Sequence, residues 1–467
     1  MRIFQHVEQA AVDAEEVATR RWRWSGKWIL SGLLLVVAVL TVGLYYFYHP
    51  YTELTADTPG YLEFVRQLRE TGNPINVFRL PTYPLFILVI TLIAGPANLF
   101  AVSIVQGMLY ILAVLEFYLL TCLIFQRAWL AFVLSLLLAT NVILISYSKL
   151  LMTEGISLWL LITISLLAVR ILQGGNWRLL KWLALCLALL FFTRPEWAAF
   201  PILIYVYLLW MRYRRGQLRP LLVRLGLSLA LLYTLLGGYV LGNLIINHYP
   251  GLTYVENMNL VGKVMQYQMQ NEAPPQYEQV RRVIDDNVTH THLTPYQLVA
   301  RHPEFGRDNG RVLGDFARAI ILRHPLEFGL KTVPMLFASL TSYYPVNTMS
   351  PPPGGPRHDW SEQGVNALLS VHRMLYASNA LFPYCALIWL ALLCWPCTRR
   401  QWSVQAMGLL VLTVLFVWTL TTLGGYFLSD LMRVHIVFDP LITLTVWGTI
   451  LGIPTLLPAR RRTWIIS

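Results

Sequence analysis

Long apolar runs separated by short polar segments dominate the chain. Runs of roughly 18 to 25 apolar residues are long enough for a helix to cross the hydrocarbon of a bilayer. Such runs lie at 28–47, 99–124, 128–147, 154–173, 221–246, 376–396, 404–427 and 434–457, and shorter ones lie at 179–193 and 197–211. The pattern predicts an all-α protein, a polytopic membrane helical bundle with about ten crossings plus interfacial helices.

The composition supports a membrane protein and excludes an ordinary soluble domain. Of the 467 residues, 56% are hydrophobic and 13% are charged, and the mean hydropathy is +0.53. The net charge of +12 does not indicate a nucleic-acid partner, because the basic residues fall in short clusters between apolar runs. These clusters instead set the orientation of the chain in the membrane.

The basic clusters predict that both termini face the cytoplasm. They lie at 20–27, at 212–219 within "MRYRRGQLR", at Arg399 and Arg400, and at 460–462. Cytoplasmic segments carry the excess of Lys and Arg. The first run comes after a long polar head, and no small-x-small cleavage site follows it, so it is expected to remain as a span rather than to be removed. The expected location is the cell (plasma) membrane.

Two apolar segments are expected to lie at the interface instead of crossing. If 81–95 crossed the membrane, several basic residues would face the outside, against the excess of Lys and Arg in cytoplasmic segments: Arg127, Arg170, Arg178 and Lys181. The segment 326–345 contains Lys331 and Pro334 and precedes the Pro/Gly-rich "SPPPGGPRHDW". Both are predicted to be interfacial or re-entrant helices.

The predicted organisation has four parts. They are a cytoplasmic N-terminal segment, 1–27; a transmembrane catalytic module, 28–247, with a first outer loop at 48–98; a large outer loop with an interfacial helix, 248–375; and C-terminal transmembrane helices with a basic tail, 376–467.

Ionisable residues from separate regions are predicted to meet at the outer ends of the helices. They are Asp57, Glu154, Arg194, Glu196, Asp430 and Arg433. Each also has a structural explanation: Asp57 and Glu154 as helix caps, and the others as local ion pairs within "TRPEW" and "DLMR". Charged groups beside hydrocarbon are costly unless they pair or serve a site, so their convergence favours a functional pocket.

The order of these motifs resembles a known superfamily. "TADTPGYLEFVRQL" is followed by "FRLPTYPLF", "TEG", "TRPEW" and finally "DLMRVHIVFDPL". This order is similar to that in the GT-C membrane glycosyltransferases, in particular the bacterial branch with the aminoarabinose transferases of lipid A and the protein mannosyltransferases. The resemblance covers 28–215 and, less closely, the last crossings. The 248–375 loop matches no family motif.

The resemblance implies transfer of a sugar, with inversion, from a polyprenyl-phosphate or polyprenyl-diphosphate donor to an acceptor on the outer face. Asp57 matches the first-loop Asp and is expected to act as base or to orient the acceptor. A partly dry pocket is expected to raise the pKa of its carboxyl toward that task. Phosphate binding is assigned to Arg194, Arg433 and Arg79, with Glu196, Asp430 and Tyr61 in support.

Glu154 matches the second acidic position, which in some members helps to hold a divalent cation and in others orients the acceptor. Thr58 follows Asp57 where the protein mannosyltransferases have a second acidic residue, so a metal stays undecided. The expected partners are the lipid-linked sugar, the bilayer and a lipid, glycan or protein acceptor, without nucleic acid. Tyrosines of the large loop are candidates to cover the acceptor: Tyr254, Tyr267, Tyr277, Tyr296, Tyr343 and Tyr344.

Other classes of function make different predictions. A lipid or sugar transporter would have inverted repeats and charges near the middle of its helices, and neither is evident in the sequence. A ligase or polymerase of lipid-linked glycans would depend on basic residues of the large loop, such as Arg281, Arg282, His290 and His292. A scaffold or channel would leave the carboxylates unexplained.

Overall fold

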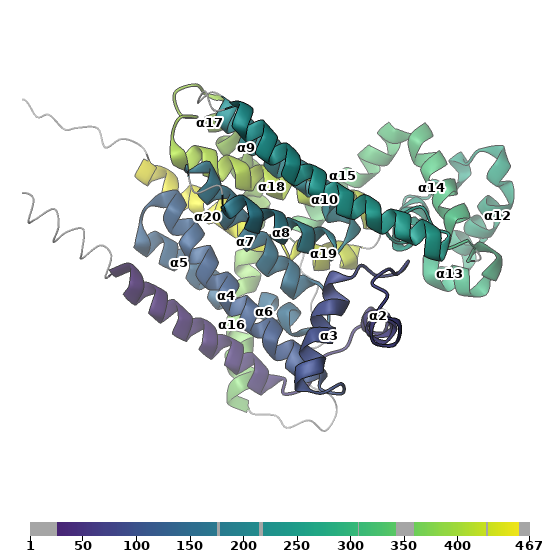
Figure 1. Cartoon of the computed structure of the whole chain (residues 1–467), viewed down its shortest axis with the longest axis horizontal. Helices are drawn as coiled ribbons and strands as arrows, with labels where there is room; N and C mark the ends of the chain where they lie inside the picture. The colour runs from purple at the N-terminus through teal and green to yellow at the C-terminus, as the bar shows by residue number, and fades with distance from the viewer. Residues whose placement is uncertain are drawn as a thin grey trace, which may run out of the picture.

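A computed structural model of the chain shows a bundle of helices with a smaller helical module at one end (Figure 1). The structure describes residues 26–174, 178–213, 218–306, 308–341, 359–425 and 428–456. No β-strand occurs within these residues, which confirms the predicted all-α class.

The described part of the chain is a succession of helices. After the first helix, Gly26–Tyr48, the α-helices are α2 Thr58–Thr71, α3 Thr82–Ala94, α4 Leu99–Phe125, α5 Ala128–Ala139, α6 Val142–Lys149, α7 Glu154–Leu172, α8 Leu179–Phe191, α9 Phe200–Tyr213, α10 Leu218–Asn247, α11 Val255–Gln266, α12 Glu278–Asp286, α13 Pro295–Arg301, α14 Arg311–Arg323, α15 Pro325–Thr341, α16 Asp359–Ala377, α17 Phe382–Cys394, α18 Trp402–Gly424, α19 Leu428–His435 and α20 Asp439–Leu456.

Within the described residues, six helices are long and apolar enough to cross a membrane, or seven if the bent pair α5 and α6 is one span. They are the first helix, α4, α7, α10, the continuous stretch Trp360–Cys394, and α18. The chain is therefore a multi-pass membrane protein. The predicted crossings at 179–193 and 197–211 are shorter apolar helices, and the last predicted crossing corresponds to α20.

The predicted crossing at 128–147 is broken near its middle. Helices α5 and α6 meet at an angle of 54°. The break has a local cause, because the Asn141 side chain accepts hydrogen bonds from the backbone of Ile143 at 3.1 Å and Leu144 at 3.2 Å and so starts a new helix. As a result α6 ends inside the protein, and every one of its residues is buried.

The segments predicted to be interfacial are short helices. The run at 81–95 forms α3, whose 13 residues are fewer than a span needs. The run at 326–345 forms α15, which contains Pro334. The C-terminal crossing begins further upstream than 376, since α16 starts at Asp359 and the helix Trp360–Cys394 passes through the predicted boundary of the large loop.

Helix α7 lies at the centre of the bundle. In the most apolar 18-residue stretch of α7, 78% is buried, whereas the corresponding stretches of the first helix and α10 are 28% and 17% buried. Helix α4 packs along α7, and α18 and α20 complete the core from the C-terminal half of the chain. In Figure 1 the first helix and α10 run along the outside of the bundle. The central position of α7 places its N-terminal residue, Glu154, inside the protein.

Helices α11 to α15 form a module with a hydrophobic core of its own, which we call the α11–α15 module. Its core includes Val261, Val264, Leu313 and Phe316. Helices α11 and α14 pack so closely at Gly314 that a Cβ there would lie 2.2 Å from the Asn257 Oδ1, so the contact requires a glycine. Figure 1 shows α12, α13 and α14 beyond the end of the bundle, at the far end of the long helix α10.

Candidate functional site

The predicted charged residues lie at helix ends that meet at one place. Asp57 directly precedes α2, and Arg79 lies in the connection between α2 and α3. Glu154 is the first residue of α7, and Arg194 precedes the short 3-10 helix Pro195–Ala199. Arg433 comes from α19, near the other end of the sequence. Five segments thus contribute charged groups, and the segment of Arg194 also supplies Glu196.

These groups form a continuous row of alternating charges, which we call the ion chain. It consists of Arg79, Asp57, Arg433, Glu154, Arg194 and Glu196, in that order. The successive N–O distances are 2.7, 2.8, 3.1, 2.6 and 3.5 Å. Three guanidinium groups therefore balance three carboxylates, and no single pair is isolated. Five of the six residues predicted to converge lie in this row together with Arg79, and the sixth, Asp430, has a side chain outside those that the structure describes.

Asp57 stands at the N-cap position of α2, but its side chain makes no capping hydrogen bond. Instead its two oxygens accept from Arg79 Nη2 and Arg433 Nη1. Burial acts to raise the pKa of this carboxyl, but the guanidinium groups of Arg433 and Arg79 outweigh it and hold the pKa well below its usual range. The expectation of a raised pKa is wrong for this state, because the neighbouring charges have a larger effect than the dry surroundings.

Glu154 and Arg194 form the buried end of the ion chain. Pro195 disfavours a helical conformation at the preceding residue, and Arg194 is extended, with φ −153° and ψ 143°. Its side chain then donates to Glu154 Oε1 at 2.6 Å and, through Nε, to the Thr153 hydroxyl at 2.8 Å. The Glu154 side chain is only 1% exposed, compared with 25% for Asp57. Asp57 is therefore accessible from solvent, whereas Glu154 is not.

Arg79 is held between two aromatic rings. Its Cζ lies 4.6 Å from the ring centroid of Tyr61 and 4.3 Å from that of Phe78. The backbone is set by the Asn76 side chain, which accepts from the amides of Phe78 and Arg79 at 2.8 and 2.9 Å. A Cβ at Gly60 would meet Phe78 at 2.7 Å, so the glycine of "PGYL" permits this close packing. Tyr61, which was predicted only as a supporting residue of the site, therefore contacts Arg79.

The α11–α15 module reaches the site through aromatic contacts with Phe78. Tyr254 stacks on the Phe78 ring at 5.2 Å, Tyr296 meets it edge-on at 6.4 Å, and the Tyr254 amide donates to the Val77 carbonyl. Tyr267 and Tyr277 pack instead within the core of the module, and residues 343 and 344 lie outside the described part of the chain. The predicted tyrosine cover is thus reduced to two residues that touch the wall of the site.

Replacing Tyr254 with alanine is expected to increase amide exchange in residues 76–79 about fivefold, because an aromatic pair of this kind contributes about 1 kcal/mol. Hydrogen exchange with mass spectrometry on the purified chain measures this change. The matched control is Tyr277→Ala, whose ring contacts Phe316 inside the module. Unchanged exchange at 76–79 in the Tyr254 variant would show that the module does not hold this segment.

The arrangement of the carboxylates does not fit a divalent cation. No group of three or more His, Cys, Asp or Glu side chains suited to a metal occurs in the described part of the chain. Asp57 and Glu154 each pair with two guanidinium groups, so both carboxylates are already balanced by positive charge in this state. The side chain of Asp430 lies outside those that the structure describes.

Three of the basic residues expected of a ligase form local ion pairs on or next to α12. Arg281 and Arg282 both pair with Glu278 on α12 at 2.8 Å, and His290 lies 3.1 Å from Asp286. The Arg282 and His290 side chains are 75% and 69% exposed. Such local pairs on a helix surface are typical of solvated faces and contribute little energy.

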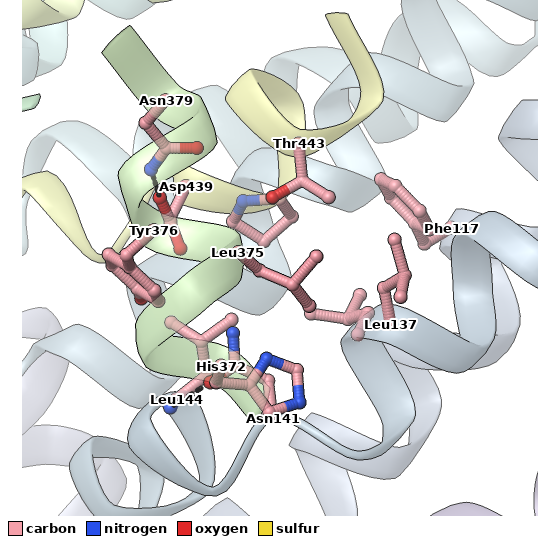
Figure 2. A pocket seen from close by; sticks show the side chains of 12 residues that line it. Phe117, Leu137, Asn141, Leu144, His372, Leu375, Tyr376, Asn379, Asp439 and Thr443 are labelled. Atoms are coloured by element: carbon pink, nitrogen blue, oxygen red, sulfur yellow. Dashed lines mark hydrogen bonds between the residues drawn. The ribbon is translucent and has the colours of Figure 1, made fainter. Parts of the chain in front are cut away.

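A small cavity with both apolar and polar side chains in its wall lies elsewhere in the bundle, between α4, α5, α6, α16 and α20. Figure 2 shows His372, Tyr376, Asn379 and Asp439 around it. Its volume of about 10 Å³ holds roughly one water molecule and is too small for a sugar or a phosphate. Asn379 donates to Asp439 at 3.1 Å, which joins two distant helices. The sequence reading missed this group, whose polar residues are scattered within apolar runs.

No protein-family model matches the chain, and no curated protein matches it. Among solved structures, the chain is similar to the archaeal oligosaccharyltransferase AglB from Archaeoglobus fulgidus in complex with an inhibitory peptide and a dolichol-phosphate, with 14% identity and a TM-score of 0.45. The match covers 90% of this chain and 50% of that one, so the chain spans about half the length of AglB.

Proposed function

We propose that the chain is an inverting membrane glycosyltransferase of the GT-C type. In this proposal a polyprenyl-phosphate or polyprenyl-diphosphate donor gives its sugar to an acceptor hydroxyl or amine at the outer face of the cell membrane. The observation that carries it is the ion chain, which brings three arginines and three carboxylates to adjoining helix ends. Arginines suit phosphate because their planar groups bind its oxygens with two parallel hydrogen bonds.

The proposed donor phosphate binds at the exposed part of the ion chain. Arg433 and Asp57 are each 25% exposed, and Arg79 is 13% exposed. An incoming phosphate competes with Asp57 for the guanidinium groups of Arg79 and Arg433. When these groups turn to the phosphate, the Asp57 carboxylate loses the neighbours that lower its pKa. Its basicity then rises at the moment when a donor is bound.

The proposed reaction is a single displacement. The acceptor oxygen or nitrogen attacks the anomeric carbon, the bond from this carbon to the phosphate oxygen breaks, and the bonding electron pair leaves with the phosphate. Asp57 takes the acceptor proton, and Arg433 and Arg79 stabilise the charge that develops on the leaving group. Glu154 is assigned a positioning role in this scheme, since it pairs with Arg194 and Arg433 and its side chain is almost fully buried.

Replacing Asp57 with asparagine is expected to lower transfer at least about 100-fold, because the general base is lost. The assay supplies the purified chain with a panel of radiolabelled polyprenyl-phosphate sugars, and the sugar that is transferred identifies the donor. Glu63→Gln is the matched control, because Glu63 lies on the same helix α2 but is 60% exposed and pairs with Arg66.

Two results would contradict the proposal. If wild type consumes no donor in the panel, transport or glycan ligation becomes the better hypothesis. If the Asp57→Asn and Glu63→Gln variants both transfer sugar as fast as wild type, the Asp57 carboxylate has only a structural role.

A further inference from the structure

A second charged cluster lies deep in the protein beside the ion chain. It consists of His49, Glu53 and Lys149, which are 0%, 5% and 0% exposed. Lys149 Nζ lies 3.8 Å from Glu53 Oε1 and contacts the His49 carbonyl oxygen, and His49 Nδ1 lies 3.3 Å from the same carboxylate. Charges buried to this degree are costly, so their retention calls for a role.

Aromatic rings surround the lysine. The Lys149 ammonium lies 5.6, 5.2 and 5.3 Å from the ring centroids of Tyr45, Tyr46 and Tyr51. Rings at this distance attract a desolvated cation. Few positions of the ammonium allow contact with three rings, a carboxylate and a carbonyl oxygen at the same time. The ammonium therefore has a narrowly defined place, which an apolar side chain would not require.

The cluster joins the two segments that carry Asp57 and Glu154. Glu53 lies a few residues before Asp57, and Lys149 ends α6 a few residues before Glu154. Between them the Leu151 amide donates to the Glu53 carbonyl at 3.3 Å, and the Thr58 hydroxyl donates to the Leu151 carbonyl at 3.3 Å.

Helix α4 holds the second segment from the other side. The Gln106 side chain donates to the carbonyls of Ser148 and Leu150 at 3.0 and 2.9 Å, and the Ser103 hydroxyl donates to that of Lys149. The segment 148–154 is therefore fixed to the rigid centre of the bundle. The ion pair between Glu53 and Lys149 attaches the segment 49–58 to the segment 148–154.

We propose that Glu53 and Lys149 are positioning residues that set the separation of Asp57 and Glu154. Arg433 forms ion pairs with both carboxylates, with N–O distances of 2.8 and 3.1 Å, so a change in their separation weakens at least one of these pairs. This inference rests on the proposed function for its kinetic consequence. Its structural consequence stands independently.

The test removes both charges together, since removing one would leave the other buried without its partner. In the full-length chain, the double variant Glu53→Gln with Lys149→Met is expected to keep a melting temperature close to that of wild type. Amide exchange at 53–58 and 150–154 is expected to rise. The turnover number kcat is expected to fall about 30-fold, while KM for the donor changes less than about twofold, because misplacement near the reacting atoms lowers the rate more than binding.

The matched control is Glu327→Gln with Lys331→Met, an ion pair of 2.7 Å on α15 whose side chains are 42% and 37% exposed. It is expected to change none of these quantities. If the first double variant is stable and retains both wild-type kcat and wild-type exchange, the positioning role is overturned while the proposed function stands. If wild type transfers no sugar, the proposed function fails, and the exchange measurement still decides the positioning role. A double variant that does not fold, with a control pair that does, would assign Glu53 and Lys149 to stability and also overturn the proposal.

Discussion

Replacing Arg433 with glutamine is expected to reduce sugar transfer about 100-fold, the usual effect of removing one donor that stabilises developing negative charge. Arg433 is the only guanidinium among the described side chains that bridges Asp57 and Glu154, with N–O distances of 2.8 and 3.1 Å. In the proposed reaction its loss removes a partner of the leaving phosphate, and it also interrupts the ion chain between Asp57 and Glu154. The measurement is kcat/KM with the donor identified in the transfer assay, together with the affinity for the polyprenyl phosphate alone.

Arg433→Lys and Arg66→Gln make this test specific. A lysine keeps the charge but cannot reach both carboxylates with one planar group, so an intermediate loss is expected. Arg66 is 64% exposed and pairs with Glu63 on α2, so Arg66→Gln is expected to behave as wild type. Full activity of Arg433→Gln in a folded protein would contradict the assigned role in phosphate binding.

Replacing Glu154 with glutamine is expected to destabilise the chain by about 3 kcal/mol, near the lower end of the cost of breaking a buried ion pair. The Glu154 carboxylate is 1% exposed and compensates both Arg194 and Arg433. Glutamine retains the shape but leaves two guanidinium groups with too little negative charge nearby. Thermal unfolding of the purified chain measures the loss as a lower melting temperature.

Glu196→Gln is the matched control for this stability effect. Glu196 pairs with the same arginine, but at 3.5 Å and with 25% of its side chain exposed, so a loss below about 1 kcal/mol is expected. The double variant Glu154→Gln with Arg194→Gln is expected to recover part of the stability, because it removes the uncompensated charge. Equal effects of Glu154→Gln and Glu196→Gln would contradict the central place of Glu154.

Much of the site could be predicted because charged residues are conspicuous beside apolar runs. Asp57, Glu154, Arg194 and Arg433 each stand at the end of such a run, and the orientation rule places these ends on one side. Arg79 and Tyr61 were predicted from the motifs that they share with the resembling family. The structure shows these side chains in contact.

The pairing within the site could not be predicted. The sequence permits Asp57 to cap α2 and Arg194 to pair with Glu196, and it does not show that Arg433, almost the whole chain away, bridges Asp57 and Glu154. The low pKa of Asp57 follows from that pairing, so its direction was predicted wrongly.

The sequence by itself determined the membrane setting, the helical class and the ends of helices at which charges collect. These properties follow from the length and periodicity of apolar runs, which act locally along the chain. Only the tertiary structure decided that the charges form one ion chain, that Glu154 is buried while Asp57 is accessible, that α5 and α6 are bent apart, and that Glu53 and Lys149 join the two carboxylate segments. The physical reason is that ion pairing and burial depend on distances between segments remote in sequence, and packing of whole helices sets these distances.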